Sequence, residues 1–185
     1  MSLALRLSQL IDRLLAVLAG IGGWCIVALV LAVCYDVVTR YFGVPKVLGL
    51  TSTKLQEGQY WLHSYAIVLC VGFAYVRQAH VRIDLVRERL SERTKYWIEA
   101  VGCAVMLIPY SILGAWLSYP YVHRSFSLHE SSRSGNGLDE VWLLKSGLVI
   151  LFVLTGLAGL SVFIKAVAGL AGRLPAAQRA ETIDG

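Results

Sequence analysis

The stretch that decides the fold is Leu14–Tyr35, LLAVLAGIGGWCIVALVLAVCY, which contains 22 residues and no Asp, Glu, Lys or Arg. At about 1.5 Å of rise per residue, a helix of this length spans the roughly 30 Å hydrocarbon core of a bilayer. Three further stretches share this character, and all four are 19 to 23 residues long: 14–35, 58–76, 100–122 and 146–164. The sequence therefore predicts an all-α integral membrane protein with four transmembrane helices.

The composition of the whole chain agrees with a membrane protein. Of the 185 residues, 57% are apolar and 16% are charged, whereas soluble domains carry about 25% charged residues. The net charge of +5 could suggest a nucleic-acid partner, but the basic residues are dispersed among loops that flank the spans. Because they form no continuous basic face, we expect no nucleic-acid binding.

The distribution of Lys and Arg predicts the orientation. The N-terminal segment, the loop between the second and third spans, and the C-terminal tail hold 11 of the 17 basic residues. The positive-inside rule then places both termini and this second loop in the cytoplasm. The first apolar stretch is longer than the roughly 7 to 15 residues of a signal-peptide core, so we expect it to be retained. We predict one membrane domain over 1–173 and a mobile cytoplasmic tail over 174–185.

Short interfacial helices are predicted on the cytoplasmic side. Asp84 can cap an amphipathic helix that runs through Leu90 in the second loop, and Ser91 can cap the helix that becomes the third span. The N-terminal segment has an apolar face at helical spacing, which is typical of a helix that lies in the interface and runs into the first span. This face consists of Leu3, Leu7, Leu10 and Leu14.

The predicted spans contain no Asp, Glu, Lys or Arg. Ion-coupled transporters usually place such residues there, despite a cost of about 2.5 to 3.5 kcal/mol each at the helix centre. The sequence therefore argues against a self-sufficient pump. Pro109 should kink the third span, because it frees the Val105 carbonyl. Pairs of small residues four apart, such as Ala16 with Gly20, favour close helix packing within this chain or with a partner.

A membrane anchor subunit of a redox complex is the alternative class. Such subunits can carry haem, commonly between two histidines that face each other across a bundle. Of the four histidines only His63 lies within a predicted span, and His123 is the one imaginable partner for it. All four cysteines lie in the spans without C-x-x-C spacing, which indicates small apolar residues. We therefore expect no cofactor and no metal.

Three motifs carry a resemblance to a known family. They are DVVTRYF at 36–42, LQEGQYW at 55–61 and HVRID at 80–84. Their order and spacing resemble signatures of the small membrane subunit, or Q subunit, of tripartite ATP-independent periplasmic (TRAP) transporters. The loop at 125–138 is similar to the branch of mannitol/chloroaromatic or 2-oxo acid type. Together with the four-span pattern, the resemblance covers about residues 10–165.

The resemblance implies a role in a bacterial inner-membrane importer. In that family a periplasmic solute-binding protein (P type) captures an organic acid, and a large multi-span subunit (M type) carries it inward with sodium. The small subunit braces the large one and has no enzymatic activity. The expected partners are therefore the M and P subunits and membrane lipid. The substrate is selected by the other two components, so this sequence does not specify it.

Seven residues are candidates for partner contact or a structural role: Asp36, Arg40, Glu57, His80, Arg82, Asp84 and Glu130. Asp36 and Arg40 are four apart and can pair on one helix. Glu57 suits the positive N-terminal end of the second span. Arg82 and Asp84 lie at the cytoplasmic headgroup level, where membrane anchoring and partner contact are both open. Glu130 is either solvated or turned toward the binding protein.

The predicted orientation can be tested by cysteine labelling. Single cysteines at Thr51 and Ser134, in a variant that lacks the native cysteines, should react with a membrane-impermeant thiol reagent in intact cells. Both positions lie in loops that the positive-inside rule places in the periplasm. Labelling of Ser91→Cys in place of both outer positions would reverse the orientation.

Overall fold

The computed structural model describes residues 3–46, 49–79, 90–175 and 179. The described residues form helices and the connections between them, and they contain no strand. In chain order the elements are α1 (Leu3–Tyr41), α2 (Ser52–Val76), α4 (Glu92–Gly102), the π-helical segment η2 (Cys103–Leu107), α5 (Ile108–Ser127) and α6 (Trp142–Leu170). Of the predicted interfacial helix between Asp84 and Leu90, all but the last residue lies outside the described residues.

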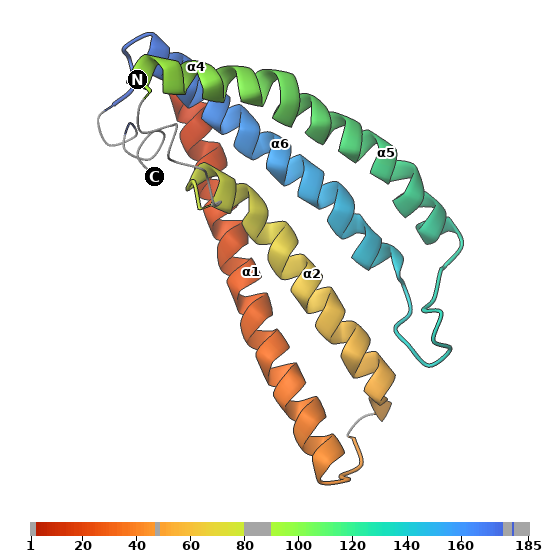
Figure 1. Cartoon of the computed structure of the whole chain (residues 1–185). Helices are drawn as coiled ribbons and strands as arrows, with labels where there is room; N and C mark the ends of the chain where they lie inside the picture. The colour runs from red at the N-terminus through yellow and green to blue at the C-terminus, as the bar shows by residue number, and fades with distance from the viewer. Residues whose placement is uncertain (1–2, 47–48, 80–89, 176–178, 180–185) are drawn as a thin grey trace.

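Helix α6 is the central element of the bundle. It packs against α1, α2, α4, η2 and α5, and it lies between the α1–α2 pair and the arc formed by α4 and α5 (Figure 1). The start of α1, the start of α4 and the end of α6 meet at one end of the bundle. The end of α1, the start of α2 and the connection 128–141 lie at the opposite end, which we call the loop end.

Three helical stretches in the described part of the chain are long and apolar enough to cross a membrane. They are Leu3–Tyr41, Glu92–Ser127 and Trp142–Leu170, and they contain the predicted spans 14–35, 100–122 and 146–164. Helix α2 has 25 residues and includes the predicted span 58–76. Its first half carries Gln59, His63 and Ser64, so it is less apolar than the other three. Membrane crossing by α2 stays a prediction.

The N-terminal segment is continuous with the first span. Helix α1 has 39 residues, which corresponds to roughly 58 Å and exceeds the thickness of the hydrocarbon core. The four leucines that define the predicted interfacial face are exposed: Leu3, Leu7, Leu10 and Leu14. The opposite face, which includes Leu5, Ser8 and Leu15, is buried. Placement of the exposed face in a membrane interface stays a prediction.

The third predicted span is a single curved helix (Figure 1). Its N-terminus is capped as predicted, because the Ser91 hydroxyl accepts a hydrogen bond from the Thr94 amide. The π-helical segment η2 ends two residues before Pro109, and the Ile108 amide donates to the Cys103 carbonyl five residues earlier. This wider turn accommodates the proline, which has no amide hydrogen to donate. Pro120 also lies inside α5, so Pro109 is not the only proline within the predicted span 100–122, and the expectation of a single proline there was wrong.

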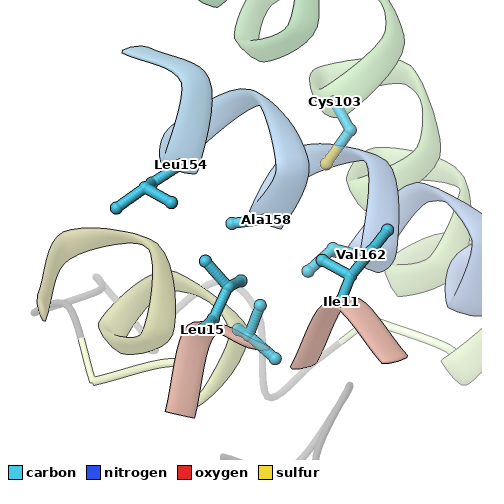
Figure 2. Packing of buried hydrophobic residues seen from close by; sticks show 7 residues of the cluster. Ile11, Leu15, Cys103, Leu154, Ala158 and Val162 are labelled. Atoms are coloured by element: carbon cyan, nitrogen blue, oxygen red, sulfur yellow. The ribbon is translucent and has the colours of Figure 1, made fainter. Parts of the chain in front are cut away.

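The core depends on small residues that let helices approach closely. Leu15, Cys103, Leu154 and Ala158 pack together from α1, η2 and α6 (Figure 2). At Gly72 of α2, a Cβ atom would lie 2.9 Å from the Leu154 carbonyl oxygen. Because lipid provides no hydrophobic drive between helices, such close backbone contact contributes much of their association. Cys103 is fully buried in this cluster, in agreement with its prediction as a small apolar residue.

The small residues divide into two groups by their surroundings. A Cβ at Gly114 of α5 would lie 2.5 Å from the Phe152 ring of α6, so this glycine serves packing within the chain. Gly20 and Gly23 of α1 have no atom within 4 Å of an added Cβ. Packing within the chain therefore explains why a glycine is needed at position 114. It does not explain the glycines at positions 20 and 23.

A buried ion pair joins α1 to α6 at the end opposite the loops. Lys165 is 2% exposed, and its Nζ lies 2.6 Å from Oδ2 of Asp12. The Ser161 hydroxyl donates to Oδ1 of Asp12 at 2.5 Å, and the Ser8 and Ser161 hydroxyls are 2.9 Å apart. The sequence reasoning counted Lys165 among the basic residues of the cytoplasmic tail. That assignment was wrong, because Lys165 belongs to α6 and its charge is buried against Asp12.

Loss of Asp12 should destabilise the chain strongly. Asp12→Asn leaves the Lys165 ammonium buried without its counter-charge, so the free energy of unfolding should fall by about 3 kcal/mol. The double variant Asp12→Asn/Lys165→Met should recover most of this loss. Thermal unfolding in detergent measures both effects, with Arg13→Gln on the exposed neighbouring position as the control. An Asp12→Asn chain that unfolds at the wild-type temperature would contradict the structural role of the pair.

Candidate functional site

The loop end of the bundle brings together four of the seven candidate residues. Asp36 and Arg40 lie at the end of α1, Glu57 lies near the start of α2, and Glu130 lies in the connection before α6. His80, Arg82 and Asp84 lie outside the described residues. The site is therefore built from the described acidic residues and the groups that surround them.

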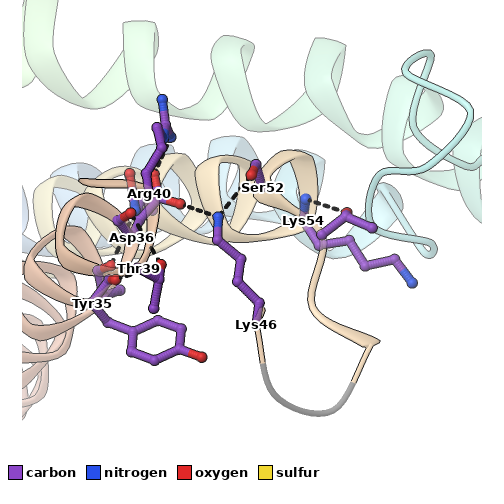
Figure 3. Close-up of polar contacts among 10 residues, drawn as sticks. Tyr35, Asp36, Thr39, Arg40, Lys46, Ser52 and Lys54 are labelled. Carbon is purple, nitrogen blue, oxygen red and sulfur yellow. Dashed lines mark hydrogen bonds and ion pairs between the residues drawn. The ribbon is translucent and has the colours of Figure 1, made fainter. Parts of the chain in front are cut away.

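Asp36 connects the end of α1 to the start of α2. Its carboxylate is buried and accepts hydrogen bonds from Arg40, one turn later, and from Lys46 in the following loop (Figure 3). Lys46 also donates to the Ser52 hydroxyl at 2.7 Å. The i,i+4 spacing predicted the pairing of Asp36 with Arg40, whereas Lys46 is ten residues away and reaches Asp36 through the loop. The network fixes the turn between the two helices.

Glu57 holds the connection between α5 and α6. Its Oε1 accepts hydrogen bonds from the hydroxyls of Ser132 and Ser134, the latter at 3.0 Å, and its Oε2 accepts from the Leu138 amide at 2.6 Å. A Cβ at Gly137 would lie 2.4 Å from Oε2, so only glycine fits there without movement. Sequence reasoning considered the helix N-terminus or a partner for Glu57 and missed this contact.

Glu130 is bound within its own chain as well. It pairs with Lys145 of α6, whose Nζ also lies 4.2 Å from the centroid of the Tyr121 ring. The Lys145 hydrogen bond holds the pKa of Glu130 below the ordinary glutamate value. The pairing therefore stabilises the fold above the ordinary glutamate pKa, and this contribution is lost as the pH falls through the lowered pKa.

A cavity of about 300 Å³ lies beside these groups. Residues of α2, α5, α6 and the 128–141 connection line it, including Glu57, Trp61, Tyr121 and Lys145. We call it the loop-end cavity. A second cavity of about 290 Å³, between α5 and α6, has an apolar lining that includes Ile112.

The described residues include no group of three or more His, Cys, Asp or Glu side chains that could hold a metal ion. His63 on α2 and His123 on α5 are both exposed. The histidine pair considered for haem is therefore not enclosed in the bundle. The described part of the chain thus offers hydrogen-bonding and ionic contacts at the loop end and no assembled metal site.

The comparison with protein families decides the class of this chain. Residues 29–169 match the family described as tripartite ATP-independent periplasmic transporters, DctQ component. The chain belongs to this family. No curated protein and no solved structure gives a match.

Membership in the family confirms the resemblance that the three motifs indicated. The family is a component of a transporter and not an enzyme family, so membership argues against the redox-anchor alternative. Together with the apolar helices, it identifies a multi-pass inner-membrane protein. The branch suggested by the 125–138 loop stays a prediction.

Replacement of Glu57 should release the connection between α5 and α6. In Glu57→Ala the Leu138 amide loses its acceptor, and its hydrogen exchange should accelerate by at least tenfold because local opening becomes easier. Exchange of the α6 amides near Leu154 should not change. Asp139→Ala, on an exposed residue of the same connection, is the control. Equal protection of Leu138 in the wild type and in Glu57→Ala would contradict this role.

Proposed function

We propose that this protein is the small subunit of a sodium-driven TRAP importer of organic acids and that it braces the large transport subunit. The observation that carries the proposal is that four of its acidic side chains already have partners within the chain. Asp12, Asp36, Glu57 and Glu130 are each bound by side chains or amides of the same chain. Family membership shows that the chain is a component of a transporter. Because these four carboxylates already bind groups of the same chain, they favour a structural role over coordination of sodium or of the transported substrate.

A brace must be rigid, and the contacts of this chain support that property. In rigid-body alternating access, one part of a transporter moves against a fixed part. The Asp12–Lys165 pair ties α1 to α6 at one end, and the Asp36 network ties α1 to α2 at the other. Both ends of α1 are therefore fixed to neighbouring helices, as a stationary wall requires.

We assign the orientation from the basic residues together with the fold. The beginning of α1 and the end of α6 meet at one end of the bundle, near Leu5, Ala166 and Leu174. This arrangement supports an even number of crossings, including α2. The positive-inside rule then favours a cytoplasmic location for this end. The loop end faces the periplasm, where the binding protein delivers its ligand.

The exposed face of α1 is our candidate contact for the large subunit. Gly20 and Gly23 have open space beside them, which would admit the backbone of another helix. Trp24 lies on the same face near the middle of the predicted span and is 74% exposed. Tryptophan is enriched at the membrane interface, so an exposed Trp at mid-span favours a protein neighbour over lipid tails.

The decisive experiment compares two glycines in reconstituted transport. Gly20→Leu should reduce copurification with the large subunit and lower the rate of sodium-driven uptake in proteoliposomes by about tenfold, because it fills the space for a partner helix. The thermal unfolding temperature of the isolated chain should not change. Gly114→Leu is the contrasting variant, since its clash with Phe152 should lower that temperature directly.

The sodium stoichiometry tests the brace itself. Uptake by Gly20→Leu complexes should be slower with the same number of sodium ions per substrate. A variant of this chain that assembles normally and transports with fewer sodium ions per substrate would refute the structural role.

A further inference from the structure

The loop-end cavity lies where two apolar helices end. It is bounded by the start of α2, the C-terminal part of α5, the start of α6 and the connection 128–141. Lys145 is the fourth residue of α6 and Tyr121 lies in the last two turns of α5. The helical stretches that contain α5 and α6 are long and apolar enough to cross a membrane. Because the cavity lies where α5 ends and α6 begins, it lies at the level of the lipid headgroups.

Among the charged residues that line the cavity, one of each sign makes no close ion pair with a described residue. Glu130 and Lys145 neutralise each other. Glu57 accepts hydrogen bonds from Ser132, Ser134 and Leu138, but it makes no ion pair with any described residue. Arg133 lines the cavity and is exposed; its charge acts on Glu130, but it makes no close ion pair within the described part of the chain. A ligand with one positive and one negative group complements this pair of charges.

Two aromatic side chains of α2 line the cavity together with Glu57. Tyr60 and Trp61 line the cavity from the helical turn that follows Glu57. The faces of such rings attract an ammonium group, and desolvation strengthens the attraction. A primary ammonium can also donate hydrogen bonds to the Glu57 carboxylate. The positive group of the ligand is therefore expected next to Glu57 and these two rings.

Apolar residues of α6 border the cavity. Val141 and Leu144 line its α6 side. Leu148 lies one turn deeper along the same side of α6 and is exposed. An acyl chain attached to the ligand would run along this surface into the bilayer, whereas a water-soluble ligand would leave it uncovered.

We propose that the loop-end cavity binds a phospholipid with a phosphoethanolamine headgroup. The ammonium group contacts Glu57, Tyr60 and Trp61, and the phosphate contacts Arg133. The acyl chains follow α6 past Leu148. A phosphoglycerol headgroup has no ammonium group, so it leaves the negative charge of Glu57 without a counter-charge. Free phosphoethanolamine has both charges, but it has no acyl chain to cover the apolar surface of α6.

The binding test uses the purified full-length chain and native mass spectrometry. The probes are dioleoylphosphatidylethanolamine, dioleoylphosphatidylglycerol and free phosphoethanolamine, each added to delipidated protein in detergent. The wild type should retain phosphatidylethanolamine at one per chain, with at least tenfold higher affinity than phosphatidylglycerol. Binding of free phosphoethanolamine should be weaker than binding of the lipid by at least a hundredfold.

Variants locate the lipid in the cavity. Arg133→Gln and Tyr60→Ala should each reduce the affinity for phosphatidylethanolamine by at least fivefold, and both leave the hydrogen bonds of Glu57 in place. Arg124→Gln, on an exposed arginine of α5 outside the cavity lining, is the matched control and should bind as the wild type does. Glu57→Gln should remove the preference for phosphatidylethanolamine over phosphatidylglycerol.

Two results would overturn the proposal. One is equal affinity of the wild type for the two lipids. The other is wild-type retention of phosphatidylethanolamine by both Arg133→Gln and Tyr60→Ala. Neither result depends on transport, so the proposal can fail while the bracing function stands.

Discussion

Close contact between helix backbones around α6 is the constraint on which the rest of the structure depends. At Gly72 of α2 the helices approach so closely that a larger side chain would collide with the α6 backbone at Leu154, and Ala158 of α6 is fully buried in the same core. In lipid this packing contributes association energy that the hydrophobic effect cannot provide between helices. Once α6 is seated, Lys165 lies against Asp12 at one end and Lys145 lies against Glu130 at the other. The polar contacts at both ends thus follow from the position of one helix.

The polar contacts in turn explain how a chain with this composition can act as a support. A buried or membrane-level charge is costly unless it is paired, and Asp12, Asp36, Glu57 and Glu130 all have partners within the chain. The same contacts connect successive helices, since Asp36 joins α1 to α2 and Glu57 joins α2 to the connection before α6. The polar contacts within the chain do not cover the outer face of α1 or the loop-end cavity. We assign these surfaces to the large subunit and to lipid.

Sequence reasoning succeeded where the deciding property is local and failed where it depends on distant residues. The Ser91 cap and the Asp36–Arg40 pair follow from spacings of three and four residues. The Glu57 contacts join residues 75 to 81 positions apart, and the Ser161–Asp12 hydrogen bond joins residues 149 apart. No periodicity indicates such pairs. Lys165 was misassigned for the same reason, because its position after an apolar stretch is typical of a solvated flank.

The sequence by itself determined the all-helical membrane class and the transporter family. Both depend on order along the chain, namely long stretches free of charge and short motifs at characteristic intervals. Only the tertiary structure decided which glycines pack inside the bundle and which remain open, as Gly114 and Gly20 show. It also decided that Glu57 binds its own chain and that Arg133 lines the same cavity. The reason is physical: a charge or a small residue acquires its role from the atoms opposite it, and the packing of α6 against its neighbours selects those atoms.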